Sequence, residues 1–270
     1  MARTLRPLSL GGLLDETFNI YRRNFLLFVG ISAVPNLTLL LLQLLLEGSG
    51  LGGARLNSVL SVLAWLTSTL ASLFATSIVA AATTLGVSDI YLEIPTSMVS
   101  CFSRIAHKAL TVLYVSFIVG LIVGLGVLLC IIPGILWAGT YGIAVPAVVL
   151  ENITGSESLT RSKHLTEGSI GRVIVVYFLT TIFTVGMVLA LNEGAALLGS
   201  TVFYGRGLLS GKMLEDVLAS LGEILFGPVT AIALTLVYYD QRVRKEAFDI
   251  DHMMSQISAR DIARAEASSG

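Results

Sequence analysis

Charged residues are scarce in this chain of 270 residues: Asp, Glu, Lys and Arg make up only 13%, against 54% hydrophobic residues. Soluble globular domains carry roughly a quarter charged residues, so this chain lacks the polar surface that a water-soluble fold of its length needs. A lipid bilayer supplies the missing apolar solvent. Because the net charge is −1, no basic field favours nucleic acid as a partner. The composition therefore predicts an integral membrane protein.

Residues that carry metal and redox chemistry are also few, with two cysteines and three histidines. Two cysteines give no disulfide framework. The histidines His107, His164 and His252 show neither the HxH nor the HxxxH spacing of metal ligands. Neither the GxxxxGK[ST] nor the GxSxG motif is present. We therefore expect no metal, no cofactor and no catalytic residue, and we interpret the protein as a non-enzyme.

Long apolar runs dominate what is present, and their lengths predict six transmembrane helices. The runs lie at residues 25–46, 56–85, 109–132, 135–150, 173–191 and 218–239. The prediction is an all-α, polytopic membrane bundle that forms one integral membrane domain over residues 1–270. Within it we expect an interfacial helix at 1–24, the six-span bundle at 25–239 and a cytoplasmic tail at 240–270.

Prolines and glycines interrupt these runs. A proline inside a span removes a backbone donor and bends the helix, and small residues let helix backbones approach closely. Gly120 and Gly124 form a GxxxG pattern, which we interpret as a contact inside the bundle. Pro133 and Gly134 are expected to form a tight turn between the third and fourth spans. The candidate structural residues are therefore Pro35, Gly120, Gly124, Pro133, Gly134, Pro146 and Pro228.

Polar side chains within the spans are few. Asn36 follows Pro35 in the first run, and we expect it to hydrogen-bond to another helix, with a ligand site as the weaker alternative. Ionisable residues at the membrane midplane would indicate a transport path. Glu223 is the deepest acidic residue, about one turn inside the sixth run. We interpret it as lying at the outer headgroup level, with an outer water-filled vestibule as the alternative.

The basic residues divide unequally between the two sides of the predicted bundle. Of the 17 Lys and Arg residues, only Arg55, Arg206 and Lys212 fall on one side, and the other 14 share the opposite side. The positive-inside rule places the larger set in the cytoplasm, together with both termini. Basic side chains at a membrane surface attract anionic lipid headgroups. The candidate headgroup contacts are Arg22, Arg23, Arg104, Lys108, Arg161, Arg242, Arg244 and Lys245.

One unit of surface helix, long span, turn and return span recurs three times, beginning near Leu10, Thr96 and Ser156. This recurrence is the basis for a hypothesis of a three-fold helix-plus-hairpin repeat. In the first unit, Leu10, Leu13 and Phe18 share a helical face with further apolar residues. That helix either lies in the cytoplasmic interface or packs on the protein's own cytoplasmic face. In the third unit, Thr154 and Glu157 have the spacing of a capping box.

Four stretches of the sequence form a familiar set. They are RPLSLG from Arg6 with LDETF from Leu14 and YRRNF from Tyr21; IPGI from Ile132; VPAVVLE from Val145 with SLTRS from Ser158; and YYDQRVRKE from Tyr238. With these residues, in this order, the chain resembles the bacterial family named for the membrane domain of glycerophosphoryl diester phosphodiesterase. The resemblance implies a standalone module of the bacterial inner membrane, without the catalytic barrel of the phosphodiesterase.

These observations favour a non-enzymatic membrane module. We expect it to bind membrane lipids, or a partner membrane or cytoplasmic protein, through its cytoplasmic helices and tail. The alternative is a transporter of small molecules or lipids, with its path at the centre of the three repeats; an intramembrane enzyme ranks third. A polar, open cavity between the repeats would favour transport, whereas a tightly packed centre with a flat basic face would favour the binding module.

Overall fold

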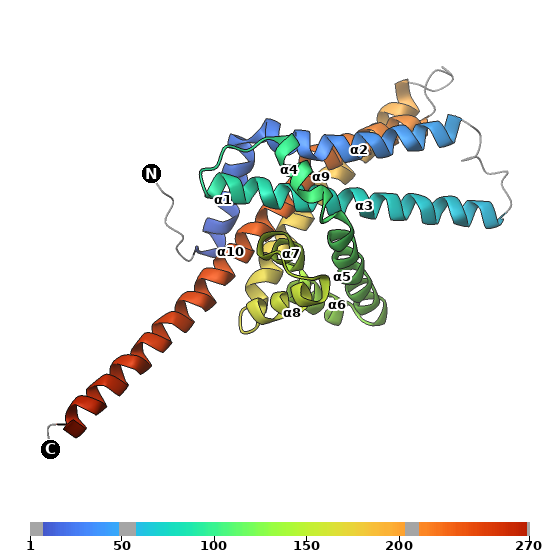
Figure 1. The fold of residues 1–270 in the computed structure, drawn as a ribbon. Helices are drawn as coiled ribbons and strands as arrows, with labels where there is room; N and C mark the ends of the chain where they lie inside the picture. The colour runs from blue at the N-terminus through green and yellow to red at the C-terminus, as the bar shows by residue number, and fades with distance from the viewer. Residues whose placement is uncertain (1–7, 49–57, 203–210, 269–270) are drawn as a thin grey trace.

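The computed structural model of the chain describes residues 8–48, 58–202 and 211–268, so Arg55 and Arg206 lie outside the described residues, as does the side chain of Lys212. Within these ranges the chain is all α, without a strand (Figure 1). The helices are α1 (Leu10–Arg23), α2 (Phe25–Gly48), α3 (Ser58–Tyr91), α4 (Met98–Ala106), α5 (Ala109–Leu129), α6 (Ile131–Tyr141), α7 (Ala144–Glu151), α8 (Gly155–Thr166), α9 (Ile170–Val202) and α10 (Gly211–Ser268).

Six stretches of these helices are long and apolar enough to cross a membrane. They are Phe25–Leu45, Trp65–Tyr91, Ala109–Leu129, Ile131–Glu151, Ile170–Gly194 and Leu214–Glu246. Each holds at least 21 residues, which matches the roughly 20 residues that span a bilayer core. The prediction of a polytopic helical membrane protein is therefore confirmed.

The order of the helices repeats three times as a short helix followed by a hairpin. The first unit is α1–α2–α3, the second is α4–α5 with α6 and α7, and the third is α8–α9–α10. Each short helix begins at a hydroxyl N-cap, namely Ser9, Ser97 and Thr154, the residue type that satisfies the first free amides of a helix. The repeat is thus confirmed in the order of its elements.

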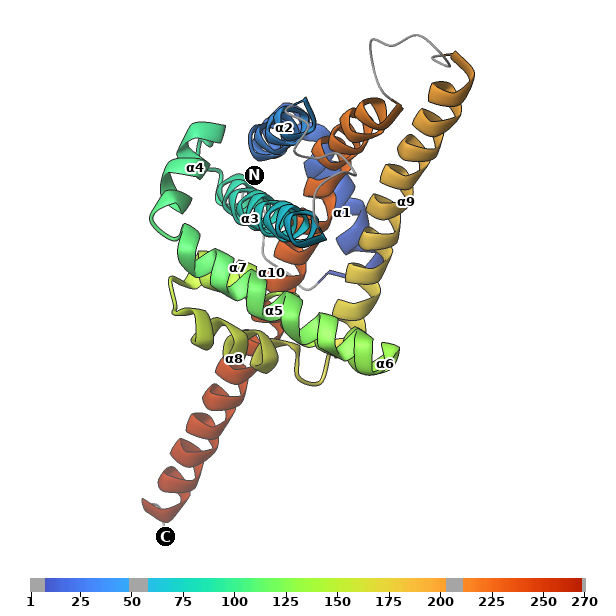
Figure 2. The same ribbon diagram turned by 90° about the vertical axis from the view of Figure 1, so that its right-hand side faces the viewer.

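Helix α10 is the centre of the assembly. It packs against α1, α2, α3, α7, α8 and α9, and Figure 2 shows it running between α3 on one side and α9 on the other. Its residues Ile232, Leu236, Val237 and Tyr238 are almost completely buried. Helix α10 continues unbroken through residue 240, the predicted start of the tail, and Asp240 and Gln241 are buried in the bundle.

Helix α1 packs on the protein itself, mainly on α10. Its buried residues are Leu13, Thr17 and Ile20, spaced four and three apart along one helical face. Leu10 and Phe18, expected on the same face as Leu13, remain partly exposed. Packing on the protein's own surface is therefore observed, and a position of this helix in the cytoplasmic interface stays a prediction.

The turn between the third and fourth spans lies at Cys130, and the prediction of a turn at Pro133–Gly134 was wrong. Cys130 has an extended backbone between α5 and α6, and Pro133 lies in the first turn of α6. A helix tolerates proline there because the amide that proline lacks would have no partner in the helix anyway. Gly134 instead allows close packing: a Cβ on it would lie 2.7 Å from the backbone nitrogen of Val127.

The glycines that bring α5 and α6 together are not the predicted pair. A Cβ added to Gly120 or Gly124 would meet no atom of the described residues within 4 Å, so the GxxxG pattern makes no internal contact among them and that interpretation was wrong. Gly126 makes the contact instead, because a Cβ there would lie 2.8 Å from the Cα of Gly134. The three predicted in-span prolines do lie within helices: Pro35 in α2, Pro146 in α7 and Pro228 in α10.

Candidate functional site

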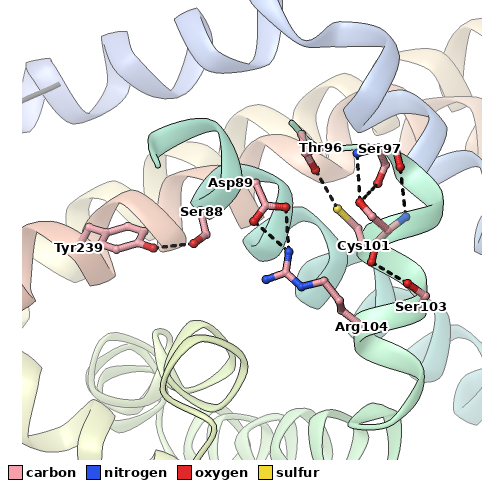
Figure 3. Close-up of polar contacts among 9 residues, drawn as sticks. Ser88, Asp89, Thr96, Ser97, Cys101, Ser103, Arg104 and Tyr239 are labelled. Atoms are coloured by element: carbon pink, nitrogen blue, oxygen red, sulfur yellow. Dashed lines mark hydrogen bonds and ion pairs between the residues drawn. The ribbon is translucent and has the colours of Figure 1, made fainter. Parts of the chain in front are cut away.

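The last helix of each unit (α3, α7 and α10, called the return helices) carries an acidic side chain that contacts the short helix of another unit or the residues just before it. The first of these side chains is Asp89, near the end of α3. Its carboxylate oxygens accept hydrogen bonds of 2.9 and 2.8 Å from Nη1 of Arg104 on α4. Asp89 is buried, whereas the side chain of Arg104 is half exposed. In Figure 3 the two side chains point toward each other across the junction of the first and second units. This ion pair therefore joins the first hairpin to the short helix that follows it.

The second contact is made by Glu151 at the end of α7. Its carboxylate accepts from Nε of Arg161 on α8 at 2.8 Å and from the hydroxyl of Tyr238 on α10 at 2.6 Å. Arg161 also pairs with Glu246, which accepts from Nε of Arg242 at 2.7 Å. Burial alone would lower the pKa of Arg161, but its bonds to Glu246 and Glu151 outweigh burial and raise it. The result is a charge-balanced cluster that joins the second unit to the third.

The third contact closes the arrangement on the first unit. The side chain of Asp240, on α10, is 1% exposed and lies 2.9 Å from Arg172 and 3.0 Å from Arg244. It also accepts a 2.8 Å hydrogen bond from the backbone amide of Leu8, just before α1. Both arginines donate in turn to the carbonyl oxygen of Leu8. A carboxylate from each return helix therefore binds the start of the next unit, and the last binds the first.

Three consecutive residues of α10 serve these contacts. Tyr238 reaches Glu151 of the second unit, Tyr239 donates to Ser88 of the first at 2.9 Å, and Asp240 holds Leu8. Successive residues on a helix point about 100° apart, so three consecutive residues of a central helix can contact neighbours on three different sides. We call this set the base network: Ser88, Asp89, Arg104, Glu151, Arg161, Arg172, Tyr238, Tyr239, Asp240, Arg242, Arg244 and Glu246.

Most of the predicted headgroup contacts belong to the base network or lie beside it. Arg104, Arg161, Arg242 and Arg244 are in ion pairs. Lys108 donates to the carbonyl of Val149 at 3.3 Å, and Lys245 donates to the carbonyl of His164. Arg22 and Arg23 are exposed at the end of α1, and neither forms an ion pair with a residue that the structure describes. Contact of any of these side chains with lipid headgroups stays a prediction.

Helix α8, which carries Arg161, starts at the predicted capping box. The backbone amide of Thr154 donates to the Glu157 carboxylate at 2.9 Å. This backbone bond, and then the Thr154 hydroxyl, hold the pKa of Glu157 below its ordinary value. A lowered pKa means that the carboxylate stabilises the folded protein above the pKa of unfolded glutamate, and that this stabilisation is lost as the pH falls through the folded pKa.

Titration of Glu157 should show this coupling. We expect the carboxyl carbon of Glu157, followed by nuclear magnetic resonance in detergent micelles, to titrate below the value of about 4.3 typical of free glutamate. Thr154→Ala should raise the midpoint only partly, because the backbone amide remains. A midpoint at or above the free value in the unmodified protein would show that the box does not form in solution.

A separate site lies inside the bundle, between the first and third units, and most of its accessible surface is apolar although several lining residues are polar. It is a pocket of about 310 Å³, which we call the mid-span pocket. Its lining comes from α2, α3, α9 and α10 and is rich in hydroxyl groups. The polar lining residues are Ser32, Asn36, Thr76, Tyr177, Thr181, Thr184, Glu223 and Thr230.

The pocket lies at the middle of the candidate spans. Asn36 is one residue from the middle of Phe25–Leu45, Thr181 is one residue from the middle of Ile170–Gly194, and Thr230 is the middle of Leu214–Glu246. Glu223 lies nine residues inside that last stretch, which is about 13 Å along a helix. Because that stretch of 33 residues is longer than the roughly 20 residues that span a bilayer core, the depth of Glu223 in the membrane stays a prediction. Glu223 is an exposed residue.

Hydrogen bonds across the pocket start from Asn36 and Ser32. The Asn36 amide donates to Ser32 of its own helix, at 2.9 Å to the carbonyl and 3.2 Å to the hydroxyl. The prediction that Asn36 bonds to another helix was therefore wrong. Ser32 makes the link, since its hydroxyl donates to the backbone carbonyl of Glu223 at 3.2 Å. The sequence showed these residues separately but not that four helices bring them together.

The part of the chain that the structure describes contains no group of three or more His, Cys, Asp or Glu side chains that could hold a metal ion. Both cysteines, Cys101 and Cys130, are free. No match to the chain was found among protein-family models, curated protein sequences or solved structures.

Proposed function

We propose that this integral membrane protein is a non-enzymatic carrier that binds a small polar solute in the mid-span pocket. The observation that carries the proposal is the position of that pocket, at the middle of four candidate spans and between two of the three units. Its volume of about 310 Å³ is at the lower end of the roughly 300–1,000 Å³ of small-molecule sites. Ionisable groups at such depth usually face a substrate path or a water-filled cavity.

The base network supports this choice over a module that binds lipid headgroups. The guanidinium groups of Arg161 and Arg244 are balanced by carboxylates of the protein, which leaves less positive charge to attract anionic lipid. Lipid or partner binding is the second candidate, and the observation that favours it is the pair of exposed arginines Arg22 and Arg23 at the end of α1.

We further propose that the protein belongs to the bacterial family that its sequence resembles, and that it lies in the inner membrane with both termini in the cytoplasm. Two of the four stretches that carry the resemblance supply neighbours in the base network. The stretch with Glu151 and Arg161 meets the stretch with Tyr238 and Glu246. The excess of Lys and Arg on the side of this network supports its cytoplasmic location.

Thiol labelling in proteoliposomes tests the carrier proposal without knowledge of the solute. In a background with Cys101→Ala and Cys130→Ser, we compare Thr181→Cys with Ile182→Cys. The two positions are adjacent on α9, but Thr181 lines the pocket whereas Ile182 is 54% exposed on the outer surface of the bundle. A neutral, polar reagent, hydroxyethyl methanethiosulfonate, should modify the Thr181→Cys thiol at least about tenfold faster, because only a hydrated thiol ionises to the reactive thiolate.

Position 182 is the matched control for depth in the membrane, and equally slow labelling at both positions would overturn the proposal. Removing the Thr181 hydroxyl costs little, since it has no hydrogen-bond partner among the described residues. A monodisperse elution profile for each variant establishes that the bundle is intact before labelling.

A further inference from the structure

We infer that the ligand of the mid-span pocket is a cation of the small organic ammonium type, with the Glu223 carboxylate as its counter-ion. This inference rests on the proposed function and names the chemical class of the solute. It is carried by three properties of the pocket: the sign of its charge, the direction of its free hydrogen-bonding groups, and its size.

The charge of the pocket is negative. Glu223 is the acidic residue in its lining, and none of the described lining residues is Lys, Arg or His. The Glu223 carboxylate forms no ion pair within the part of the chain that the structure describes. A carboxylate at this depth is costly unless it has a partner of opposite charge. Because the protein supplies none there, a bound cation is the natural partner.

Several polar groups of the pocket already donate their protons to other groups of the protein. Ser32 uses its hydroxyl proton on the carbonyl of Glu223, and Thr184 uses its proton on the carbonyl of Phe226 at 3.3 Å. The Asn36 amide nitrogen donates to Ser32. Ser32 Oγ also accepts from Asn36, and Thr184 Oγ1 lies 3.2 Å from the Thr230 hydroxyl oxygen, so each of these two oxygens keeps one lone pair for a ligand. The Thr181 hydroxyl oxygen is buried without a partner, so it adds a further free group.

Acceptor oxygens around one carboxylate suit an ammonium group better than an anion or an apolar ligand. An ammonium group carries N–H donors and a positive charge, so it can satisfy several of these oxygens at once. Charge-assisted hydrogen bonds of this kind are about twice as strong as neutral ones. The pocket volume of about 310 Å³ limits the ligand to a small molecule.

Charged thiol reagents test the inference at the Thr181→Cys thiol. We compare a cationic reagent, trimethylammonium-ethyl methanethiosulfonate, with the anionic sulfonatoethyl reagent of similar size. Each rate is divided by the rate of the same reagent with a free thiol in solution. We expect the cationic reagent to be favoured on the order of tenfold, as one nearby carboxylate attracts it and repels the anion. Glu223→Gln, which conserves the side-chain shape, should bring the ratio close to one.

Occupancy is tested in the same assay. Methylammonium chloride should slow labelling of the Thr181→Cys thiol by the neutral reagent, whereas sodium chloride at the same ionic strength should not. A ratio near one before the Glu223→Gln change, or a ratio that Glu223→Gln leaves unaltered, would overturn the cation inference. If the neutral reagent still labels the pocket in that case, the carrier proposal stands; if it also fails to label, both fall.

Discussion

Asp240→Ala is expected to destabilise the folded protein by about 3–5 kcal/mol, the usual cost of removing one partner from a buried ion pair. The Asp240 side chain is 1% exposed and faces Arg172, Arg244 and the amide of Leu8. Its loss leaves two guanidinium groups without their carboxylate partner and the backbone amide of Leu8 without its acceptor. The free energy of unfolding, measured by denaturant titration in detergent micelles, checks this expectation.

Two further variants show which part of Asp240 matters. Asp240→Asn keeps an acceptor for Leu8 but loses the charge, so we expect a loss of stability between those of the unmodified protein and Asp240→Ala. Asp15→Ala removes an exposed carboxylate on α1 and should change stability by no more than about 0.5 kcal/mol. If Asp240→Ala were as mild as Asp15→Ala, the contact that joins α10 to α1 would not form in solution.

Gly126→Ala should give the second large effect. A Cβ at Gly126 would lie 2.8 Å from the Cα and 2.9 Å from the nitrogen of Gly134. Backbone atoms cannot move aside as a flexible side chain can, so α5 and α6 must separate. Overpacking of this kind costs about 1–3 kcal/mol, and the same denaturant titration measures it.

Gly120→Ala is the matched control on the same helix. A Cβ at Gly120 meets nothing within 4 Å in the part of the chain that the structure describes, and alanine is the better helix former by about 1 kcal/mol. We therefore expect Gly120→Ala to be neutral or slightly stabilising. If Gly120→Ala lost as much stability as Gly126→Ala, the predicted GxxxG pattern would pack against another helix, as the sequence analysis expected.

The sequence was sufficient for the number of spans, the order of the three units and the starts of the short helices. Long apolar runs are local signals, and so is the capping box at Thr154, where α8 begins. No local signal in the sequence shows that Gly126, and not Gly120, is the glycine in contact with α6. Almost every residue of α5 is apolar, so the sequence carries no periodicity that distinguishes the lipid face from the face toward α6.

The candidate sites depended even more on contacts between distant residues. Leu8 and Asp240 are 232 positions apart, and no pattern in a single sequence pairs them. Arg104 and Arg161 were found, but as lipid contacts, because their carboxylate partners lie on other helices, and Arg172 was not found. Glu223 was found as the deepest acidic residue, while the hydroxyl groups around it looked ordinary, since threonines in membrane helices commonly bond within their own helix.

The three contacts made by Tyr238, Tyr239 and Asp240 also bear on how the protein is assembled. Ribosomes make the chain from its N-terminus, and earlier segments fold while later ones are still being synthesised. Ser88 and Glu151 are therefore synthesised 151 and 87 residues before their tyrosine partners. The first two hairpins are therefore synthesised before the helix that joins them, and these contacts form only after α10 has been made.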